Sequence, residues 1–253
     1  MNTNSNKYTV IYTTIVCVLV AAILAFVSQV LKPKQEANEK AETISQILTA
    51  AQFGEKSEWE AKGNDAILSF YKEKAASAIL VDEKGSRCGS LDINKAEIYT
   101  VSDLKAQNYN IKGGKQISVP VYIFNNGVAV IPIYGAGLWG QVWGYVAVAA
   151  DRRTVIGAYF DHDSETPGLG GKIKDDPSFR AQFKDEILNI ANPYNPFDIV
   201  KGGAPKTDVP DGKIDAITGA TMTCKGLDAA IDTWIKAYIP YLEIAGEGLT
   251  NEL

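Results

Sequence analysis

A run of apolar residues from position 8 to position 31 contains no charged side chain. A helix of this length matches the hydrocarbon core of a lipid bilayer, which is about 30 Å thick. A cleaved signal peptide is the alternative, but its apolar part usually has only about 7–15 residues, and the sequence AFVSQ offers no clean small-residue cleavage site. The pattern therefore predicts an uncleaved membrane anchor. Its orientation stays open, because Lys7 precedes the span while Lys32 and Lys34 follow it.

Helical periodicity predicts further helices after the anchor. Apolar residues recur on one side of residues 35–52, of residues 65–78 and of residues 177–190. A fourth amphipathic helix is expected from about Met222 to Tyr238, because apolar side chains fall on one face there. The apolar positions of this last helix are Leu227, Ile231, Trp234, Ile235 and Tyr238.

Two pairs of short apolar segments predict a sheet. Residues 119–124 and 128–135 flank Asn125-Asn126-Gly127, and Asn-Gly readily adopts the positive φ angles of a tight hairpin turn. Residues 144–150 and 154–160 flank a second short turn. Because these strands are consecutive and their connections are short, we expect them to pair in antiparallel fashion.

These elements predict an α+β fold: one N-terminal transmembrane helix, followed by a soluble domain with an antiparallel β-sheet and flanking helices. Residues 79–112 are mixed and charged, and we expect short strands and loops there. We divide the chain into a tail and anchor (1–34), an N-terminal elaboration of the soluble domain (35–118), and the domain that carries the candidate chemistry (119–253).

The composition excludes some classes of function. A net charge of -5 argues against a nucleic-acid surface. Three cysteines and one histidine are too few for a typical structural zinc site, so we predict no metal site. Only Cys88 and Cys224 could pair within the soluble part, and we expect two free thiols instead.

Three segments are rich in glycine and other special residues and are called the glycine-rich segments: residues 135–140, 162–171 and, with Gly219 between threonines, 215–223. The third comes just before the last predicted helix, so Thr221 and Thr223 should lie at or near its first turn. Backbone N–H groups there lack intrahelical partners, and the positive end of the helix dipole can hold a phosphate without any lysine. A simple N-cap threonine is the plainer reading of the same residues.

The other two glycine-rich segments could contact a planar ligand. Thr166 offers a hydroxyl, Gly168 and Gly170 allow close approach of the backbone, and Leu169 could cover an apolar face. Trp139 stands among glycines and could form an aromatic wall. A Pro-Gly turn with solvated charges and a core tryptophan are the alternatives. His162 is the only histidine, and a lone histidine is more often structural than catalytic.

Taken together, the segments resemble one family. Residues 218–221, Thr-Gly-Ala-Thr, resemble the motif of FMN-binding domains whose flavin is attached by a phosphoester bond, and Asp215 stands three residues before it. Residues 165–170, Glu-Thr-Pro-Gly-Leu-Gly, are similar to that family's second signature. The stretch from Pro132 to Ala147 resembles the C subunits of Na+-translocating NADH:quinone reductases. One departure is Cys224, where many relatives have serine.

The resemblance implies a function. FMN would be bonded through its phosphate to Thr221 by a flavin transferase of the ApbE type, with FAD as donor and magnesium. The chain would relay electrons within a larger membrane complex, and its soluble domain would lie in the periplasm. No residue would act as a catalytic acid or base. The expected FMN contacts are Thr218, Gly219, Ala220, Thr223, Leu138, Trp139, Glu165, Thr166, Gly168 and Leu169.

Three alternatives differ in class or partner. The G subunit of an Rnf ferredoxin:NAD complex would share the span, the Glu-Thr-Pro-Gly-Leu-Gly loop and the modified threonine. A non-redox anchored module would bind its ligand reversibly and lose it on denaturation. An independent flavin reductase would need a nicotinamide site, and no GxGxxG follows a predicted strand.

Overall fold

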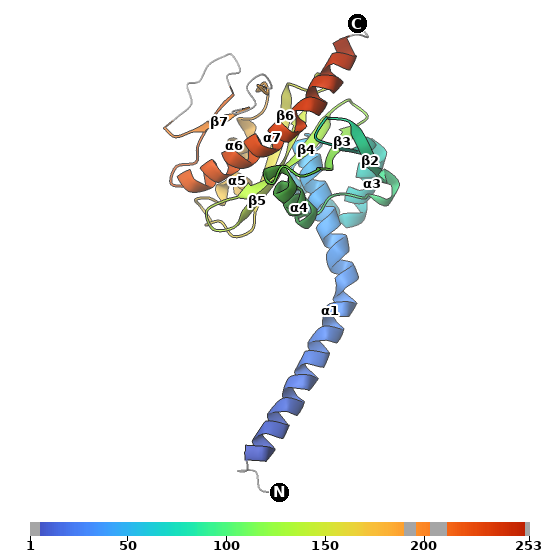
Figure 1. The fold of residues 1–253 in the computed structure, drawn as a ribbon, viewed down its shortest axis with the longest axis vertical. Coiled ribbons are helices and arrows are strands. Elements are labelled where there is room, and N and C mark those ends of the chain that lie inside the picture. Colours follow the sequence, from blue (N-terminus) through green and yellow to red (C-terminus); the bar gives the residue numbers. More distant parts are fainter. Residues whose placement is uncertain (1–5, 190–195, 203–211, 251–253) are drawn as a thin grey trace. The chain divides into compact units, whose positions relative to one another are not determined.

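The computed structural model of the protein describes residues 6–189, 196–202 and 212–250, the last four of these by their backbone only. The contacts divide the chain into two compact units, Met1–Lys40 and Ala41–Leu253. Figure 1 shows the ribbon of the chain.

Helix α1 (Asn6–Ala50) contains both the predicted anchor and the helix that follows it. Its apolar part is exposed along its length, and by length and composition it could cross a membrane. Its last turns lie in the second unit, where the predicted stripe is confirmed, because Ile44, Ile47 and Leu48 are fully buried. The helix ends at Ala50, two residues before the predicted end.

The second unit contains a six-stranded antiparallel sheet, as the hairpin patterns predict. The strand order is β2-β1-β3-β4-β5-β6, and each neighbouring pair is antiparallel. Gly127 has φ 82° in the Asn-Gly turn, which is the conformation that this turn requires. The strands are β1 (Ala75–Val81), β2 (Arg87–Leu91), β3 (Val119–Phe124), β4 (Ala129–Ala136), β5 (Gln141–Val148) and β6 (Val155–His162).

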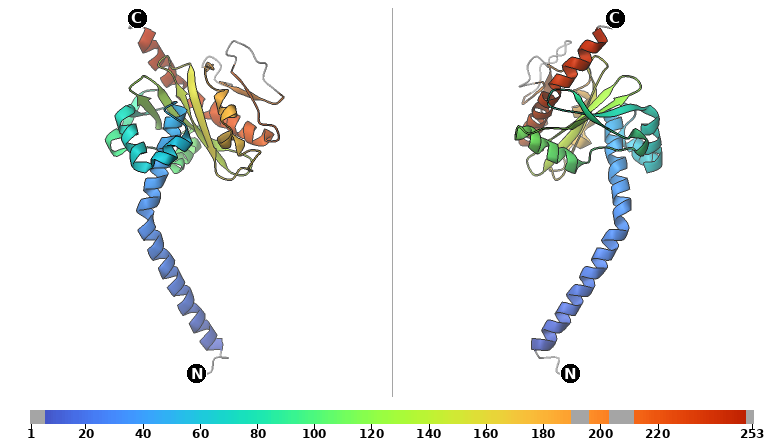
Figure 2. Two further views of the ribbon diagram at one scale, coloured as in Figure 1. Left: turned by 180° about the vertical axis from the view of Figure 1, so that it is seen from behind. Right: turned by 45° about the vertical axis from the view of Figure 1, so that its right-hand side comes forward.

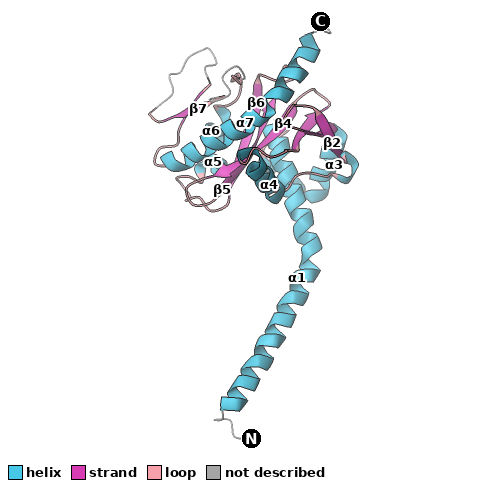
Figure 3. Cartoon of the chain, in the orientation of Figure 1, coloured by secondary structure: helices cyan, strands magenta, loops and turns pink. Residues whose placement is uncertain are grey.

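Both faces of the sheet are covered, which explains why strands β3 to β6 are buried almost throughout, while the edge strand β2 is not. Alternate residues of β3 point to different cores: Val119 and Val121 join one cluster, while Tyr122 and Phe124 join the other. The first cluster packs against α4 (Val101–Lys112), α5 (Lys172–Asp175), α6 (Pro177–Ala181) and α7 (Thr221–Thr250). The second packs against the end of α1, α2 (Lys56–Lys62) and α3 (Asn64–Lys74), and Figures 2 and 3 show the two layers.

The smaller elements complete the described residues. A 3-10 turn, η1 (Ile93–Lys95), follows β2, and β7 (Asp198–Val200) pairs in parallel with β8 (Lys213–Asp215). Cys88 is exposed, Cys224 is buried, and both are free thiols.

The structure corrects three predicted segments. Residues 101–112 form helix α4, where we expected strands and loops. Helix α3 ends at Lys74 instead of Ala78, because Ala75 turns extended and the chain pairs with β3. The helix predicted over 177–190 stops at Ala181. Its second half pairs with the start of β6 instead, since Asp185 N donates to Val155 O, and residue 190 itself lies outside the described residues.

The last helix confirms its prediction and is longer. Helix α7 begins at Thr221 and continues past Tyr238 to Thr250. All five predicted apolar positions are buried at 1% exposure or less. Burying a large apolar side chain stabilises the fold by about 1.5–3 kcal/mol, so this face fixes α7 firmly on the sheet.

Candidate cofactor site

One buried carboxylate joins the three glycine-rich segments. Glu165, in the loop between β6 and α5, is only 4% exposed. Its Oε1 accepts a hydrogen bond from the backbone N–H of Trp139 at 2.9 Å, and its Oε2 accepts one from the Thr223 hydroxyl at 2.6 Å. Glu165 therefore holds together the turn between β4 and β5, its own loop and the first turn of α7.

Glycines make room for this carboxylate. A Cβ atom on Gly137 would lie 2.3 Å from Glu165 Oε1. A Cβ atom on Gly170 would lie 2.5 Å from Thr223 Oγ1 and 2.6 Å from Glu165 Oε2. Any side chain at either position would push the loops apart, so the glycines are needed for close packing around Glu165.

The hydrogen bonds also keep Glu165 ionised. Desolvation by itself would raise the pKa of this carboxyl. The Thr223 hydroxyl and the backbone N–H groups of Trp139, Gly140 and Leu138 outweigh that effect, and the pKa lies below its ordinary value. Glu165 is thus a fixed negative charge at neutral pH, with both oxygens engaged.

The start of α7 provides an anion site beside this linkage. Thr221 is its first residue, and Cys224 N, which bonds to Ala220 O, makes the first backbone hydrogen bond of the α-helical pattern. The N–H groups of Thr221, Met222 and Thr223 precede that bond, so they have no intrahelical acceptor. They and the helix dipole favour a phosphate here.

The second and third segments also touch each other directly. Gly219 has φ 83°, a left-handed conformation that glycine adopts without strain. A Cβ atom there would lie 2.9 Å from Leu169 Cδ2, so the leucine packs against the turn that precedes α7.

Large apolar side chains are exposed around the helix start. Leu138 is 49% exposed, Trp139 69%, Leu169 44% and Met222 56%. They come from all three segments, and in a soluble domain such a group of exposed apolar residues marks a binding site. An aromatic ring system could rest on these side chains while its phosphate meets the N–H groups of α7. The residues present therefore fit a flavin mononucleotide.

The predicted FMN contact residues differ in their exposure to solvent. Leu138, Trp139 and the other exposed residues can touch a ligand, and Thr221 is half-buried. Ala220, Thr223 and Glu165 are at most 4% exposed, so they pack beneath the exposed residues of the site. The exposed group consists of Leu138, Trp139, Thr166, Gly168, Leu169, Thr218 and Gly219.

A second buried network supports the loop that carries Glu165. Asp161, 3% exposed at the end of β6, accepts a hydrogen bond from Gln46 Nε2 at 2.8 Å and pairs with Lys174 Nζ at 2.8 Å. His162 Nδ1 accepts a hydrogen bond from the N–H of Glu165. The single histidine therefore shapes the loop, as its plainer reading predicts. Within the described ranges, no three His, Cys, Asp or Glu residues form a cluster that could hold a metal ion.

Two supporting glycines, Gly137 and Gly226, were not predicted as contact residues, and Gly170 was expected to approach a ligand but instead makes room for Glu165 and Thr223. A Cβ atom on Gly226 would lie 2.2 Å from Ala136 O, so α7 meets the backbone of β4 there. A glycine inside an otherwise good helical pattern was the available signal for this close approach.

Comparison with known proteins agrees with this geometry. Residues 137–236 match the family model described as the FMN-binding domain. The C subunit of the Na(+)-translocating NADH-quinone reductase of Vibrio parahaemolyticus is 31% identical over 251 residues, covering 92% of this chain and 93% of that protein. The chain belongs to the family of these C subunits. The NqrC family thus accounts for the motifs, and the likeness to it extends over nearly the whole chain.

Other NqrC proteins extend the likeness. The corresponding protein of Pseudomonas aeruginosa is 25% identical over 92% of this chain and 93% of its own. The crystal structure of the protein from Parabacteroides distasonis has a TM-score of 0.63 at 29% identity, covering 84% of this chain and 96% of that one. The crystal structure of Shewanella oneidensis NqrC has a TM-score of 0.65 at 24% identity, and the match covers 83% of this chain and 99% of that one. It has the same fold.

Proposed function

We propose that this NqrC-family chain is the electron-carrier subunit of a Na+-translocating NADH:quinone reductase, and that its FMN is bonded through the phosphate to Thr221. The observation that carries the proposal is the position of Thr221. Thr221 is the first residue of α7, at the positive end of the helix. The exposed Leu138, Trp139 and Leu169 come from the two loops that Glu165 and Gly219 join to this helix start. A phosphate and an aromatic ring need those two environments next to each other.

The burial of the two threonines favours Thr221 over Thr223 as the acceptor. Thr223 is 1% exposed, and its hydroxyl is already donated to Glu165 at 2.6 Å. Thr221 is half-buried at the surface, where a transferase can reach it. Glu165 and Thr223 therefore act as positioning residues in this proposal, and the FMN contacts come from the exposed residues.

The attachment reaction is the one that the family resemblance implies. A transferase of the ApbE type would use FAD and magnesium. The Thr221 oxygen forms a new bond to the FMN phosphorus, the pyrophosphate bond of FAD breaks, AMP leaves, and the hydroxyl proton is released. The resulting phosphoester keeps one negative charge, which the start of α7 stabilises by about 0.3–1 kcal/mol. That energy is too small to retain FMN, so the covalent bond provides the permanent attachment.

The protein supplies position and electrostatics during turnover. When bound, the flavin supplies the ability to accept one or two electrons. Trp139 and Leu169 would cover apolar parts of the ring, and the N–H groups of α7 would hold the phosphate in place. No side chain of this site needs to transfer a proton as a general acid or base.

Partners and location follow from the same proposal. The other membrane subunits of the reductase would supply and remove the electrons, and α1 would anchor the chain in the inner membrane as a single span. The soluble unit would lie on the periplasmic side. Protease added to intact spheroplasts should digest residues 41–253, and protection of this unit would contradict the placement.

Flavin fluorescence in a denaturing gel tests the attachment. The full chain, produced together with the transferase, should fluoresce and carry the mass of one FMN. Thr221→Ala should abolish both signals, while the control Thr233→Ala, which changes a half-buried threonine further along the same helix, should keep them. Covalent FMN on Thr221→Ala would refute the assignment, and a colourless wild-type band would favour the reversible binding module.

A further inference from the structure

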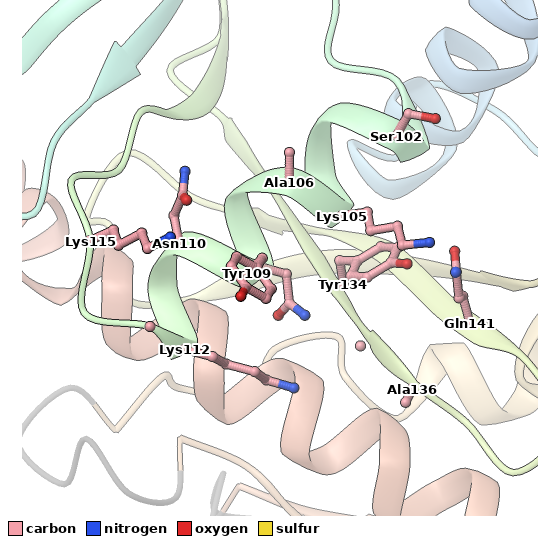
Figure 4. Close-up of a pocket in the computed structure, with 13 residues that line it drawn as sticks. Ser102, Lys105, Ala106, Tyr109, Asn110, Lys112, Lys115, Tyr134, Ala136 and Gln141 are labelled. Carbon is pink, nitrogen blue, oxygen red and sulfur yellow. The ribbon is translucent and has the colours of Figure 1, made fainter.

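A cleft of about 920 Å³ lies between α4 and the end of β4 (Figure 4). Helix α4 forms one wall with Lys105, Tyr109 and Lys112, and the end of β4 contributes Tyr134 to the lining. Ala136 and Gln141 also line the cleft, and these two residues pair across the hairpin whose turn carries Leu138 and Trp139. The cleft is therefore continuous along the chain with the exposed apolar rim of the site.

The cleft is basic although the chain as a whole is acidic. Lys105, Lys112 and Lys115 line it, and none of its 13 lining residues is acidic. All three lysines are exposed, and none forms an ion pair within the described part of the chain. The net charge of the whole chain is -5, so this positive charge is local to the cleft.

An exposed aromatic residue lies among these lysines. Tyr109 is 70% exposed, and the Lys115 ammonium lies 5.0 Å from the centre of its ring. Tyrosine is enriched at protein interfaces, where its ring is buried and its hydroxyl stays available for hydrogen bonds. Tyr109 lies among the lysines and the Leu138–Trp139 turn follows the lining residue Ala136, so exposed apolar surface accompanies the positive charge.

The spacing of the lysines indicates the kind of ligand. Lys105 and Lys112 are seven residues apart on one face of α4, which corresponds to about 10 Å along the helix axis. Three lysines spread over this length carry more positive charge than a single carboxylate or phosphate group would neutralise. An extended chain with several carboxylates and an apolar residue matches both the charge and the exposed tyrosine.

We propose that this cleft binds an acidic segment of the protein that exchanges electrons with the flavin, an inference that rests on the proposed function. The cleft adjoins the rim that would hold the flavin, so a segment bound there would bring its protein close to the cofactor. Opposite charges would speed the encounter and set its orientation, and salt would weaken it.

Zero-length carbodiimide crosslinking of the purified, assembled reductase tests the proposal. This reagent joins a lysine amine directly to a carboxylate that touches it. Mass spectrometry should find Lys105, Lys112 or Lys115 linked to aspartate or glutamate of another protein of the complex. The exposed lysines Lys72 and Lys184, which lie on other helices and loops, should give at least fivefold less of such product.

A charge-reversed pair sharpens the test. In Lys105→Glu/Lys112→Glu, crosslinking at Lys115 should fall at least fivefold, and the rate of NADH-dependent quinone reduction should fall and lose its dependence on salt. The control Lys72→Glu/Lys184→Glu changes the net charge equally and should behave as the wild type. In-gel flavin fluorescence should be unchanged in both, which separates a docking defect from failure of the proposed FMN attachment.

Other results would overturn the proposal. One is the absence of any product from the cleft lysines, and another is equal yields at the control lysines. Links to carboxylates of a second copy of this chain, identified by mixing isotope-labelled and unlabelled protein, would assign the cleft to self-association instead. Unchanged crosslinking and salt dependence in the charge-reversed pair would also exclude an acidic partner there.

Discussion

Glu165 and Trp139 are joined by a hydrogen bond, yet one is 4% exposed and the other is 69% exposed. The comparison separates two roles within a single site. Glu165 and Thr223 form a buried support that shapes three loops, while Trp139 and Leu169 form an exposed rim that a ligand can touch. Stability should therefore depend on the support, and the flavin's environment should depend on the rim.

The largest expected effect is on the support. Glu165→Ala removes the acceptor of the Trp139 N–H and of the Thr223 hydroxyl, and each unpaired buried donor costs about 1–3 kcal/mol. We expect the free energy of unfolding in urea to fall by about 3 kcal/mol. The exposed Glu83→Ala, which removes a carboxylate of the same length, is the control. Equal losses in the two variants would contradict the supporting role.

A pair of valine variants should separate the two threonines. Thr223→Val keeps the shape but leaves Glu165 Oε2 without its donor, so the unfolding free energy should fall by about 1–3 kcal/mol. Thr221→Val removes the FMN acceptor, yet it should change the unfolding free energy of the flavin-free protein by less than about 0.5 kcal/mol. Urea unfolding measures the change in stability, and in-gel fluorescence measures the bound FMN. Covalent FMN on Thr221→Val would contradict the assignment of Thr221 as the acceptor.

The support should also depend on pH. The pKa of Glu165 lies below its ordinary value of 4.5 in the folded protein, so the unfolded state binds the proton more readily. The stability from this carboxylate is complete above the unfolded pKa and is lost as the pH falls through the lower folded pKa. Glu165→Gln cannot titrate, so its deficit against the wild type should shrink on acidification from about pH 6 to pH 3. A constant deficit in urea unfolding would disprove this.

The smallest effect on stability is expected at the rim. Trp139→Ala removes a side chain that is 69% exposed, so the unfolding free energy should change by less than about 0.5 kcal/mol. In the FMN-loaded protein, however, iodide should quench flavin fluorescence more strongly, because the tryptophan no longer shields one part of the flavin ring from solvent. Tyr12→Ala lies in the apolar span of α1 and should leave quenching unaltered. Unchanged quenching in Trp139→Ala would remove the tryptophan from the flavin contacts.

Periodicity predicted the elements whose local pattern agrees with their packing. The strands of residues 119–160 and the face of α7 are such elements. Helix α4 escaped prediction because Leu104 is its only buried residue, although Thr100 and Asp103 form a capping box at its start. The helix predicted over residues 177–190 was too long, because Phe179 and Phe183 have helical spacing while the backbone near Asp185 pairs with β6.

The motifs predicted the members of the site but not their roles. Glu165 and Thr166 are neighbours in one motif, yet the first is buried and the second is exposed. Only the approach of three distant segments decides which side chain faces inward. The same limit applied to Gly137 and Gly170, since the sequence does not indicate that a carboxylate lies above them.

Gly226 packs against the backbone of β4, and this contact fixes the number of residues between Thr221 and Gly226. Five positions separate this glycine from Thr221. One inserted or deleted residue in that interval would rotate Thr221 about the helix axis by about 100° and shift it by about 1.5 Å. The hydroxyl would then face a different side of the helix. Substitutions can accumulate in this turn, but changes in its length cannot.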